Sequence, residues 1–503
     1  MKKLIAIFLV MIIFVSMISC VNDNTDNNVD SDVQDTTTES LSQEVEDTVA
    51  NTDENTDEDS QKIPDESEKQ IFKAGYSRKD ISPKEAIYLS EGSYMTDVID
   101  PIYATCIAVY DGETTVLIYT VDVKNIDASQ SEKIRMKISK ATGIPEGNIM
   151  ISSTHNHSAP TPGVPAKDVV NSAWTLSIVH KEMVNAGKEA IADLADAEMY
   201  VGTAKTTGMA FVRRYILADG TYSGIHNGNK STAPVVAYES EADDTMQIVR
   251  FAREEKKDIV IANWQAHVAH AIGKYPHSIT ADLVGFARKN AEMGGDVLFA
   301  LYIGASGNIN LTAKVPGTKK YNSHIDVGRT LGVLVRESLD DLKKIETGKI
   351  KVSYKDCEVK ILKDDAETIR KAKEVREYEE GSNEYKAMLD KYGFASKYEV
   401  NSIIGRNNAG ETGSFYIAAI AFGDLSFVSV PYEMFDTNGM QVKEGSPFEM
   451  TFVLTNAGGS FAYIPSAEAV PHGGYEVYKT SYAYGTAEQI VGELLSMLGE
   501  FKK

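Results

Sequence analysis

The sequence predicts an α/β fold of mixed type. We expect one large catalytic domain in which mixed β-sheets are flanked by helices and candidate ligands lie at strand ends. Strand and helix patterns alternate in the first half of the chain, whereas strand patterns cluster in the second half. From about residue 72 to residue 503 no linker-like, repetitive or low-complexity stretch interrupts the pattern. Because candidate catalytic and ligand residues come from both ends of this region, we expect a single domain over 71–503.

Apolar runs bounded by turn residues predict the strands, and helical periodicity predicts the helices. The expected strands are 115–123, 246–252, 258–266, 297–303, 414–421, 425–430 and 450–455. The expected helices are 129–142, 168–194, 282–293, 327–345 and 486–501. Thr280 and Thr486 are candidate N-caps. The charged segment 364–398 predicts one or two surface helices, more typical of a solvated hairpin than of a lid.

The N-terminus has the pattern of a bacterial lipoprotein signal peptide over 1–19. Lys2 and Lys3 precede an apolar run that is too short to span a bilayer comfortably, and Ser19 stands directly before Cys20. We expect cleavage before Cys20 and lipidation of its thiol, which would anchor the protein on the extracytoplasmic face of the cell membrane. An uncleaved signal anchor is the alternative.

Residues 20–70 have the composition of a disordered acidic tether. The stretch 21–70 contains 17 acidic residues, 2 lysines and almost no large apolar side chains, so it cannot bury enough surface to fold. Most of the net charge of −22 therefore belongs to the tether. Since no basic stripe is present that could neutralise phosphates, we expect no nucleic-acid partner. The sequence gives no signal for the oligomeric state.

The chain has too few cysteines for a thiolate zinc site, so a metal site would need other ligands. Apart from Cys20 there are Cys106 and Cys357, both in strand-like contexts that favour buried free thiols over a disulfide. Histidines stand after two apolar runs: His155 and His157 follow 148–152, and His267 follows 258–262. Imidazole is the commonest protein ligand of zinc, although an isolated His-x-His pair is more often structural.

Two further polar groups follow later strand patterns. Glu433 comes just after the run 425–430, and Tyr463 comes after 450–455. In open α/β sheets, ligands bind outside the carboxyl ends of strands. Two imidazoles, one carboxylate and one further oxygen would suit a zinc ion that keeps a position for water. Periodicity alone leaves open whether these four residues meet.

Six short motifs, in order, resemble those of the neutral ceramidase family, zinc-dependent amidases that split ceramide into sphingosine and fatty acid. The resemblance covers nearly all of 72–500 and is strongest for the shorter bacterial members. In chain order, the similar stretches are Gly75 to Pro83, Thr154 to Pro160, Phe211 to Tyr215, Asn263 to His267 with Asp282 and Gly285 beyond, Pro431 to Glu433, and Tyr463 to Ser466 with Tyr475 and Glu476 beyond.

The resemblance implies that zinc is held by His155, His267, Glu433 and Tyr463. It also places three residues around the reacting carbonyl, namely His157, Arg213 and Tyr475.

One departure from the family matters. Asn310 stands where well-studied ceramidases have a serine. A zinc-activated water could nevertheless attack the amide without that serine. We expect Arg213, Tyr475 or Asn310 to donate to the oxyanion and His157 to carry a proton.

These observations predict a surface-tethered, zinc-dependent amidohydrolase that acts on an N-acyl amide bond of ceramide or a similar small amphiphilic lipid. Two alternatives remain open from the sequence. The protein could be a zinc hydrolase of another amide or ester, or a surface binding lipoprotein without catalysis; Asn310 is the feature that keeps the second alternative open.

Overall fold

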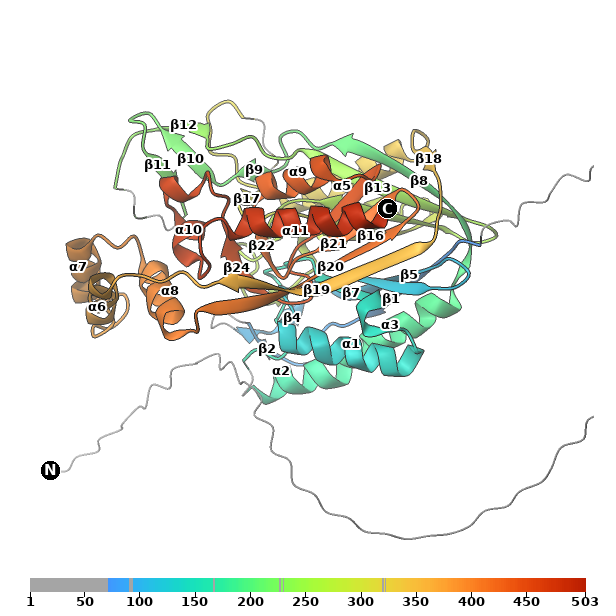
Figure 1. Cartoon of the computed structure of the whole chain (residues 1–503), viewed down its shortest axis with the longest axis horizontal. Helices are drawn as coiled ribbons and strands as arrows, with labels where there is room; N and C mark the ends of the chain where they lie inside the picture. Colours follow the sequence, from blue (N-terminus) through green and yellow to red (C-terminus); the bar gives the residue numbers. More distant parts are fainter. Residues whose placement is uncertain are drawn as a thin grey trace, which may run out of the picture. The chain divides into compact units, whose positions relative to one another are not determined.

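A computed structural model of the chain describes residues 71–89, 94–165, 168–225, 228, 230–318, 321 and 323–503. The expected signal peptide, Cys20 and the acidic tether lie outside these residues, and they remain predictions. The described body is one compact unit (Figure 1). Among its helices none is long and apolar enough to cross a membrane.

The larger of two main sheets has nine strands. Its order is β16-β14-β13-β8-β1-β5-β6-β7, with β18 pairing with β8. The β6–β7 and β14–β16 pairs are parallel and the other pairs are antiparallel, so the sheet is mixed. The strands are β1 (Lys73–Asp80), β5 (Tyr103–Tyr110), β6 (Thr115–Val121), β7 (Ile149–Ser153), β8 (Ala195–Lys205), β13 (Thr245–Arg253), β14 (Asp258–Trp264), β16 (Val297–Ile303) and β18 (Lys343–Ile345).

Side chains link the two ends of this sheet. The Tyr302 hydroxyl on β16 donates to the Ile118 carbonyl at 3.0 Å, and the Thr120 hydroxyl on β6 donates to the Leu301 carbonyl at 2.9 Å. The strongly curved sheet therefore brings the chain that leaves β7 close to the chain that leaves β14.

The second sheet has four strands in the order β19-β20-β21-β23, with β21 and β23 parallel. Its strands are β19 (Ile350–Lys360), β20 (Thr412–Phe422), β21 (Leu425–Ser429) and β23 (Met450–Leu454). One hydrophobic core joins the two sheets face to face, as the contacts of Phe422 on β20 with Phe251 on β13 and with Phe72 illustrate. The polar ends of strands from both sheets can therefore meet at one place.

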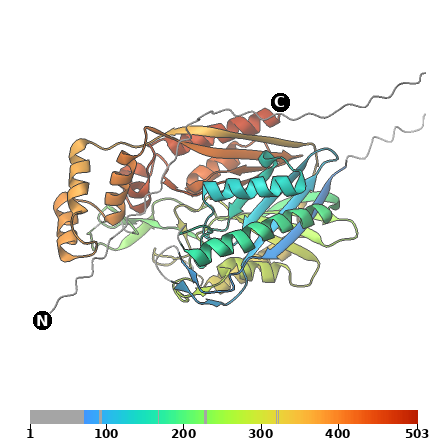
Figure 2. The ribbon, with the colours of Figure 1, turned by 90° about the horizontal axis from the view of Figure 1, so that it is seen from below.

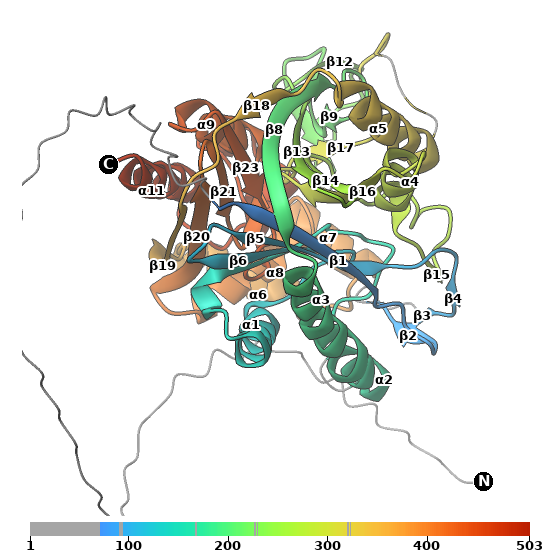
Figure 3. The ribbon, with the colours of Figure 1, turned by 90° about the vertical axis from the view of Figure 1, so that its right-hand side faces the viewer.

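Helices cover the outer faces of both sheets. The helices α1 (Ala128–Thr142) and α3 (His180–Ala192) lie across one part of the nine-stranded sheet (Figure 2), and α4 (Asp282–Ala291) and α5 (His324–Ser338) cover another. The four-stranded sheet is covered by α9 (Asp436–Gly445) and α11 (Thr486–Phe501) (Figure 3). The predicted fold class, mixed sheets flanked by helices, is confirmed.

Shorter helices and strands lie around the edge of the sheets where polar residues follow the strands. Three helices, α6 (Ala366–Val375), α7 (Asn383–Tyr392) and α8 (Lys397–Asn408), form a group with a small core of its own. Helices α2 (Val169–Trp174) and α10 (Tyr475–Lys479) are short. The short strands are β2 (Ile87–Tyr88), β3 (Tyr94–Met95), β4 (Asp97–Val98), β9 (Phe211–Val212), β10 (Arg214–Leu217), β11 (Tyr222–Gly224), β12 (Val235–Tyr238), β15 (Ser278–Ile279), β17 (Ile309–Asn310), β22 (Tyr432–Met434) and β24 (Phe461–Ile464).

Several sequence predictions differ from the structure. The N-cap of α4 is Ala281 rather than Thr280, although the Thr280 hydroxyl accepts from the Asp282 amide at 3.1 Å. The helix expected over 327–345 ends at Ser338, because 343–345 instead forms β18 on β8. The cap of α11 is Gly485 in a left-handed conformation, and Thr486 is the first helical residue. The segment 364–398 contains two complete helices and the start of a third, because its apolar residues face the small core of the helical group. Cys106 and Cys357 are buried free thiols, as predicted.

Candidate metal centre and catalytic cavity

The chain turns sharply where it leaves β7, and this turn carries two of the predicted site residues. His155 has a φ of +54°, in the left-handed region that residues other than glycine rarely adopt. The Asn156 side chain fixes the turn, since its Nδ2 donates to the Thr280 carbonyl at 2.7 Å and its Oδ1 accepts from the Ser158 backbone at 2.9 Å. The backbone N–H of His157 donates to the carbonyl of Val268 at 2.8 Å, which joins this turn to the loop after β14.

The tautomers of His155 and His267 follow from their backbone partners. The Nδ1 atom of His155 lies 3.0 Å from the Lys124 carbonyl, and the Nδ1 atom of His267 lies 2.7 Å from the Ser306 carbonyl. Because a carbonyl can only accept a hydrogen bond, both Nδ1 atoms carry the proton. In the neutral ring, Nε2 then has a lone pair, which is the state that binds metal.

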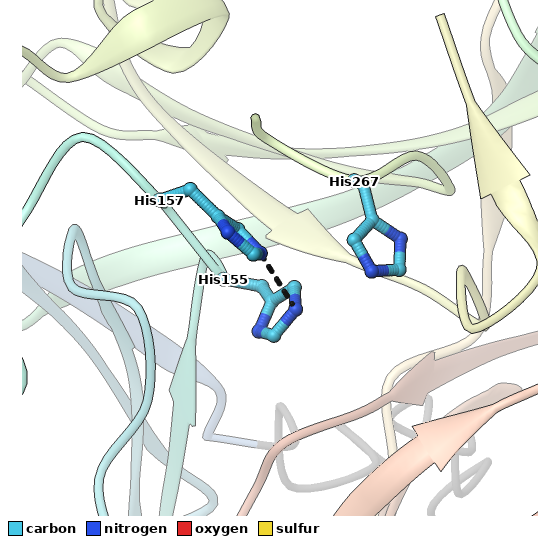
Figure 4. A group of neighbouring side chains, drawn as sticks. All are labelled: His155, His157 and His267. Carbon is cyan, nitrogen blue, oxygen red and sulfur yellow. Dashed lines mark hydrogen bonds between the residues drawn. The ribbon is translucent and has the colours of Figure 1, made fainter. Parts of the chain in front are cut away.

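The three histidine rings turn toward one another at the centre of the site (Figure 4). The Nε2 atoms of His155 and His157 are 3.2 Å apart. Within the described residues, His155, His157 and His267 form the group that could hold a metal ion, with one ligand atom of each lying within 4.8 Å of the others. Burial lowers the pKa of His267 to about 4, so this imidazole is neutral near pH 7 and needs no deprotonation to act as a ligand.

The carboxylate of Glu433 faces the same centre. Its Oε2 atom lies 3.3 Å from Nε2 of His155 and 2.9 Å from Nε2 of His267. This oxygen is buried, and a neutral imidazole whose proton is on Nδ1 has no proton on Nε2 to donate to it. The carboxylate oxygen and the two imidazole lone pairs then face one another and need a shared proton or a metal cation between them. The donor set therefore fits a bound divalent metal.

Tyr463 lies beside this donor set. Strands β22 and β24 pair in parallel, and this register places Tyr463 directly opposite Glu433. The phenol oxygen of Tyr463 is 3.5 Å from Nε2 of His267. The structure thus brings together all four residues predicted as zinc ligands, with His157 as a fifth neighbour.

Arg213 stands at the edge of this centre between β9 and β10, and its side chain is buried. Its Nε donates to the Glu476 carboxylate at 2.7 Å, its Nη2 donates to the Gly307 carbonyl at 2.8 Å, and its guanidinium carbon lies 5.4 Å from the centre of the Tyr463 ring. Glu476 also pairs with Arg214 at 3.3 Å. Because both guanidiniums share one buried carboxylate, the orientation of Arg213 depends on Glu476.

The remaining predicted residues line one cavity of about 760 Å³ beside the donor set. Tyr475, the first residue of α10, contacts the ring of Tyr463 edge-on with 5.5 Å between centroids. Asn310 lies on β17, and its Oδ1 accepts from the Thr312 backbone at 2.8 Å, which leaves its Nδ2 group as a donor. The cavity thus holds His157, Arg213, Tyr475 and Asn310 around one space.

The loop after β16 stabilises the site through hydrogen bonds to β22 and to the start of α9. The amide of Gly307 donates to the Met434 carbonyl at 2.7 Å. The Asn308 side chain donates to Oδ1 of Asp436 at 2.6 Å and accepts from the Asp436 backbone at 2.9 Å. These reciprocal bonds hold the strand that carries Glu433 against the loop that orients His267.

Sequence reasoning assigned no role to several residues that shape the site. They are Glu476, Gly307, Asn308, Asp436, Lys479 and Tyr398. Glu476 stood within a motif, and Gly307 and Asn308 stand in the stretch up to Asn310 that was compared with the family, but neither stretch indicates which side chains its residues contact. Ser306 is buried, and its backbone carbonyl rather than its hydroxyl contacts His267.

The fold is similar to that of solved ceramidase structures. A crystal structure of neutral ceramidase from Pseudomonas aeruginosa aligns with a TM-score of 0.62 over 85% of this chain and 74% of that chain, at 16% sequence identity. A structure of a ceramidase complexed with C2 aligns with a TM-score of 0.64 over 86% of this chain and 75% of that chain, at 14% identity. At these identities the likeness shows a shared fold. No protein-family model matches the sequence, and comparison with curated proteins gives no match.

Proposed function

We propose that this chain is a zinc-dependent amidohydrolase that cleaves the N-acyl amide bond of ceramide or a similar amphiphilic lipid. The observation that carries the proposal is the contact of Oε2 of Glu433 with Nε2 of His155 and of His267, which directs one carboxylate oxygen and two ring nitrogens at a single point where a metal cation fits. The fold shared with neutral ceramidases supports the choice of reaction.

The metal ligands in this proposal are His155, His267, Glu433 and Tyr463. Two neutral imidazoles, a carboxylate and a phenol oxygen are a nitrogen and oxygen set that suits zinc. When bound, zinc supplies Lewis acidity, which polarises a carbonyl and makes a water more acidic. The backbone carbonyls of Lys124 and Ser306 keep the two imidazoles in the tautomer that this role requires.

The cavity residues have separate tasks in the reaction. Arg213, Tyr475 and the Nδ2 group of Asn310 donate hydrogen bonds to the oxygen that gains charge as the amide carbon becomes tetrahedral. Burial raises the pKa of Tyr475, so its hydroxyl keeps the proton that it donates. His157, whose pKa burial lowers well below 6.5, is a neutral base that can take a proton from the attacking water and pass it to the departing nitrogen.

The proposed location is the outer face of the cell membrane, with Cys20 lipidated and the acidic segment acting as a tether. The signal-like N-terminus and the Ser19-Cys20 junction support this location. Cys20→Ala should abolish processing or release the protein from the membrane fraction. Normal processing with unchanged membrane attachment in that variant would contradict the proposed anchor.

The test of the function is an activity panel on the purified, zinc-loaded domain. N-acyl amides and the matching esters are offered with and without a chelator, and zinc is then restored. We expect amide turnover that chelation removes and zinc restores, and its loss in Glu433→Gln, which keeps the shape of the side chain but not its charge. Turnover of esters alone would favour another hydrolase, and ligand binding without turnover would favour a binding lipoprotein.

A further inference from the structure

We propose that the substrate carries an acidic group close to the scissile amide and that Lys479 binds this group. This inference rests on the proposed amide hydrolysis and names its substrate class: an anionic N-acyl amide, with a carboxylate or phosphate close to the amide, rather than a neutral ceramide.

The position of Lys479 points to a ligand. It is the last residue of α10, the helix that begins with Tyr475, and it lines the cavity that holds the metal donors. Its ammonium lies 5.0 Å from the centre of the Tyr398 ring. Within the part of the chain that the structure describes, no carboxylate pairs with this ammonium, although the side chain is half-buried. A partly desolvated cation of this kind is stabilised by a bound anion.

The charges around the cavity favour an anion as well. Among the described lining residues, four have basic side chains and only Glu433 carries a carboxylate; the four are Lys124, Arg213, Lys397 and Lys479. Glu476 compensates Arg213, and Glu380 pairs with Lys397 at 2.6 Å. Glu433 faces the histidines. Cationic side chains therefore outnumber carboxylates among the described lining residues, which favours an anionic ligand.

The protonation of Lys479 responds to the same neighbours. Burial lowers its pKa, the positive charges of Lys124 and Lys397 lower it further, and the Glu433 carboxylate raises it. These groups therefore act on one another across the cavity. An acidic group bound beside Lys479 would lie in the cavity that the metal donors also line, close to the scissile amide.

Apolar and aromatic side chains also line this cavity. Ile225, Phe461 and the ring of Tyr398 line the same space, and Tyr398 contacts Tyr475 edge-on with 5.2 Å between ring centroids. Tyr398 belongs to α8, so the helical group α6–α8 supplies part of the wall. A cation beside apolar and aromatic surface fits an amphiphile with an acidic head.

The test compares N-lauroylglycine with N-lauroylethanolamine, which share an acyl chain and differ in the acidic group. N-lauroyl phosphoethanolamine separates a phosphate from a carboxylate. We expect the wild type to prefer an acidic substrate in kcat/KM. Lys479→Gln should lower kcat/KM for that substrate by about 10- to 100-fold, with less than about 3-fold change for the neutral amide. Lys479→Arg should retain most of the preference.

The matched control is Lys386→Gln on α7, which neutralises an exposed lysine that does not line the cavity and should change neither rate. Equal rates on acidic and neutral amides, or an equal loss on both in Lys479→Gln with unchanged thermal stability, would overturn the proposal.

Binding measurements keep this inference separate from the proposed function. Isothermal titration calorimetry with N-lauroylglycine and N-lauroylethanolamine does not require turnover. If no amide is cleaved, the proposed function fails; tighter binding of the acidic compound that is lost in Lys479→Gln would still support the anion site. Equal binding of both compounds, or binding of neither, would overturn it.

Discussion

Gly307 and Glu433 are in backbone contact: a Cβ atom added to Gly307 would lie 2.5 Å from the carbonyl oxygen of Glu433 and 2.9 Å from that of Met434. No real Cβ atom approaches a carbonyl so closely, so any larger residue at position 307 must push these strands apart. The contact joins the loop after β16 in the nine-stranded sheet to β22 beyond the four-stranded sheet. Glycine is therefore required at 307 for its small size.

We expect Gly307→Ala to displace Glu433 from the histidines. The overlap should cost about 1–3 kcal/mol in the free energy of unfolding and should weaken zinc binding. Chemical denaturation and zinc titration measure the two effects. Gly492→Ala is the control, because this glycine of α11 has open space around it and the same change should be neutral or stabilising. Unchanged zinc affinity in Gly307→Ala would contradict the positioning role.

Glu476→Gln should destabilise the domain by about 3 kcal/mol or more. The substitution leaves Arg213 without its buried carboxylate and deprives Arg214 of one of two. Turnover should fall together with stability, since Arg213 loses its orientation. Glu449→Gln, which breaks an exposed pair with Lys343, should cost less than about 1 kcal/mol. Similar losses of stability in the two variants would contradict a larger contribution from the buried ion pair than from the exposed one.

His157→Ala distinguishes a proton carrier from a metal ligand. The Nε2 atom of His157 lies 3.2 Å from that of His155, so His157 is placed to bind the same metal ion, but the four proposed ligands complete the donor set without it. We expect the variant to keep its zinc and to lose about 10²- to 10⁴-fold in kcat, the range for a positioned acid–base group. Elemental analysis and zinc titration beside His155→Ala provide the comparison. A loss of zinc affinity as large as in His155→Ala would make His157 a ligand.

Asp436 should make stability depend on pH. Burial raises its pKa to about 6, against about 4 for an exposed carboxyl. Between these values the folded protein binds more protons than the unfolded chain, so this contribution stabilises at low pH and is lost as the pH rises through about 6. The stability of the wild type relative to Asp436→Asn should therefore fall from pH 4 to pH 7, by up to about 3 kcal/mol. A difference that does not vary with pH would contradict the assigned pKa.

Local sequence patterns predicted the elements well where burial and periodicity agree. The run 297–303 and the helix over 486–501 have the same bounds in the structure as β16 and α11. The extent of α5 was wrong, because the end of the expected helix pairs with the edge of the sheet instead. Strands that pair in a sheet can lie far apart in the sequence, so local propensity gives no information about which segments pair.

The site was predicted only in part for the same reason. His155 and His267 were recognisable by residue type at strand ends, but their meeting depends on the curvature that links β6 to β16 through Thr120 and Tyr302. Lys479 stood in no motif, and only the approach of α8 to α10 reveals its place in the cavity. Residue type suggests chemistry, whereas long-range packing decides which residues share a space.

The most direct test of the account is zinc titration of the metal-free domain by calorimetry, comparing the wild type with Glu433→Gln. The account predicts about one zinc per chain in the wild type. It also predicts an affinity at least about 100-fold lower in the variant, since the variant loses a charged ligand. Zinc affinity that is the same in both proteins, or a wild type that binds no zinc, would contradict the central claim that Glu433, His155 and His267 hold a metal.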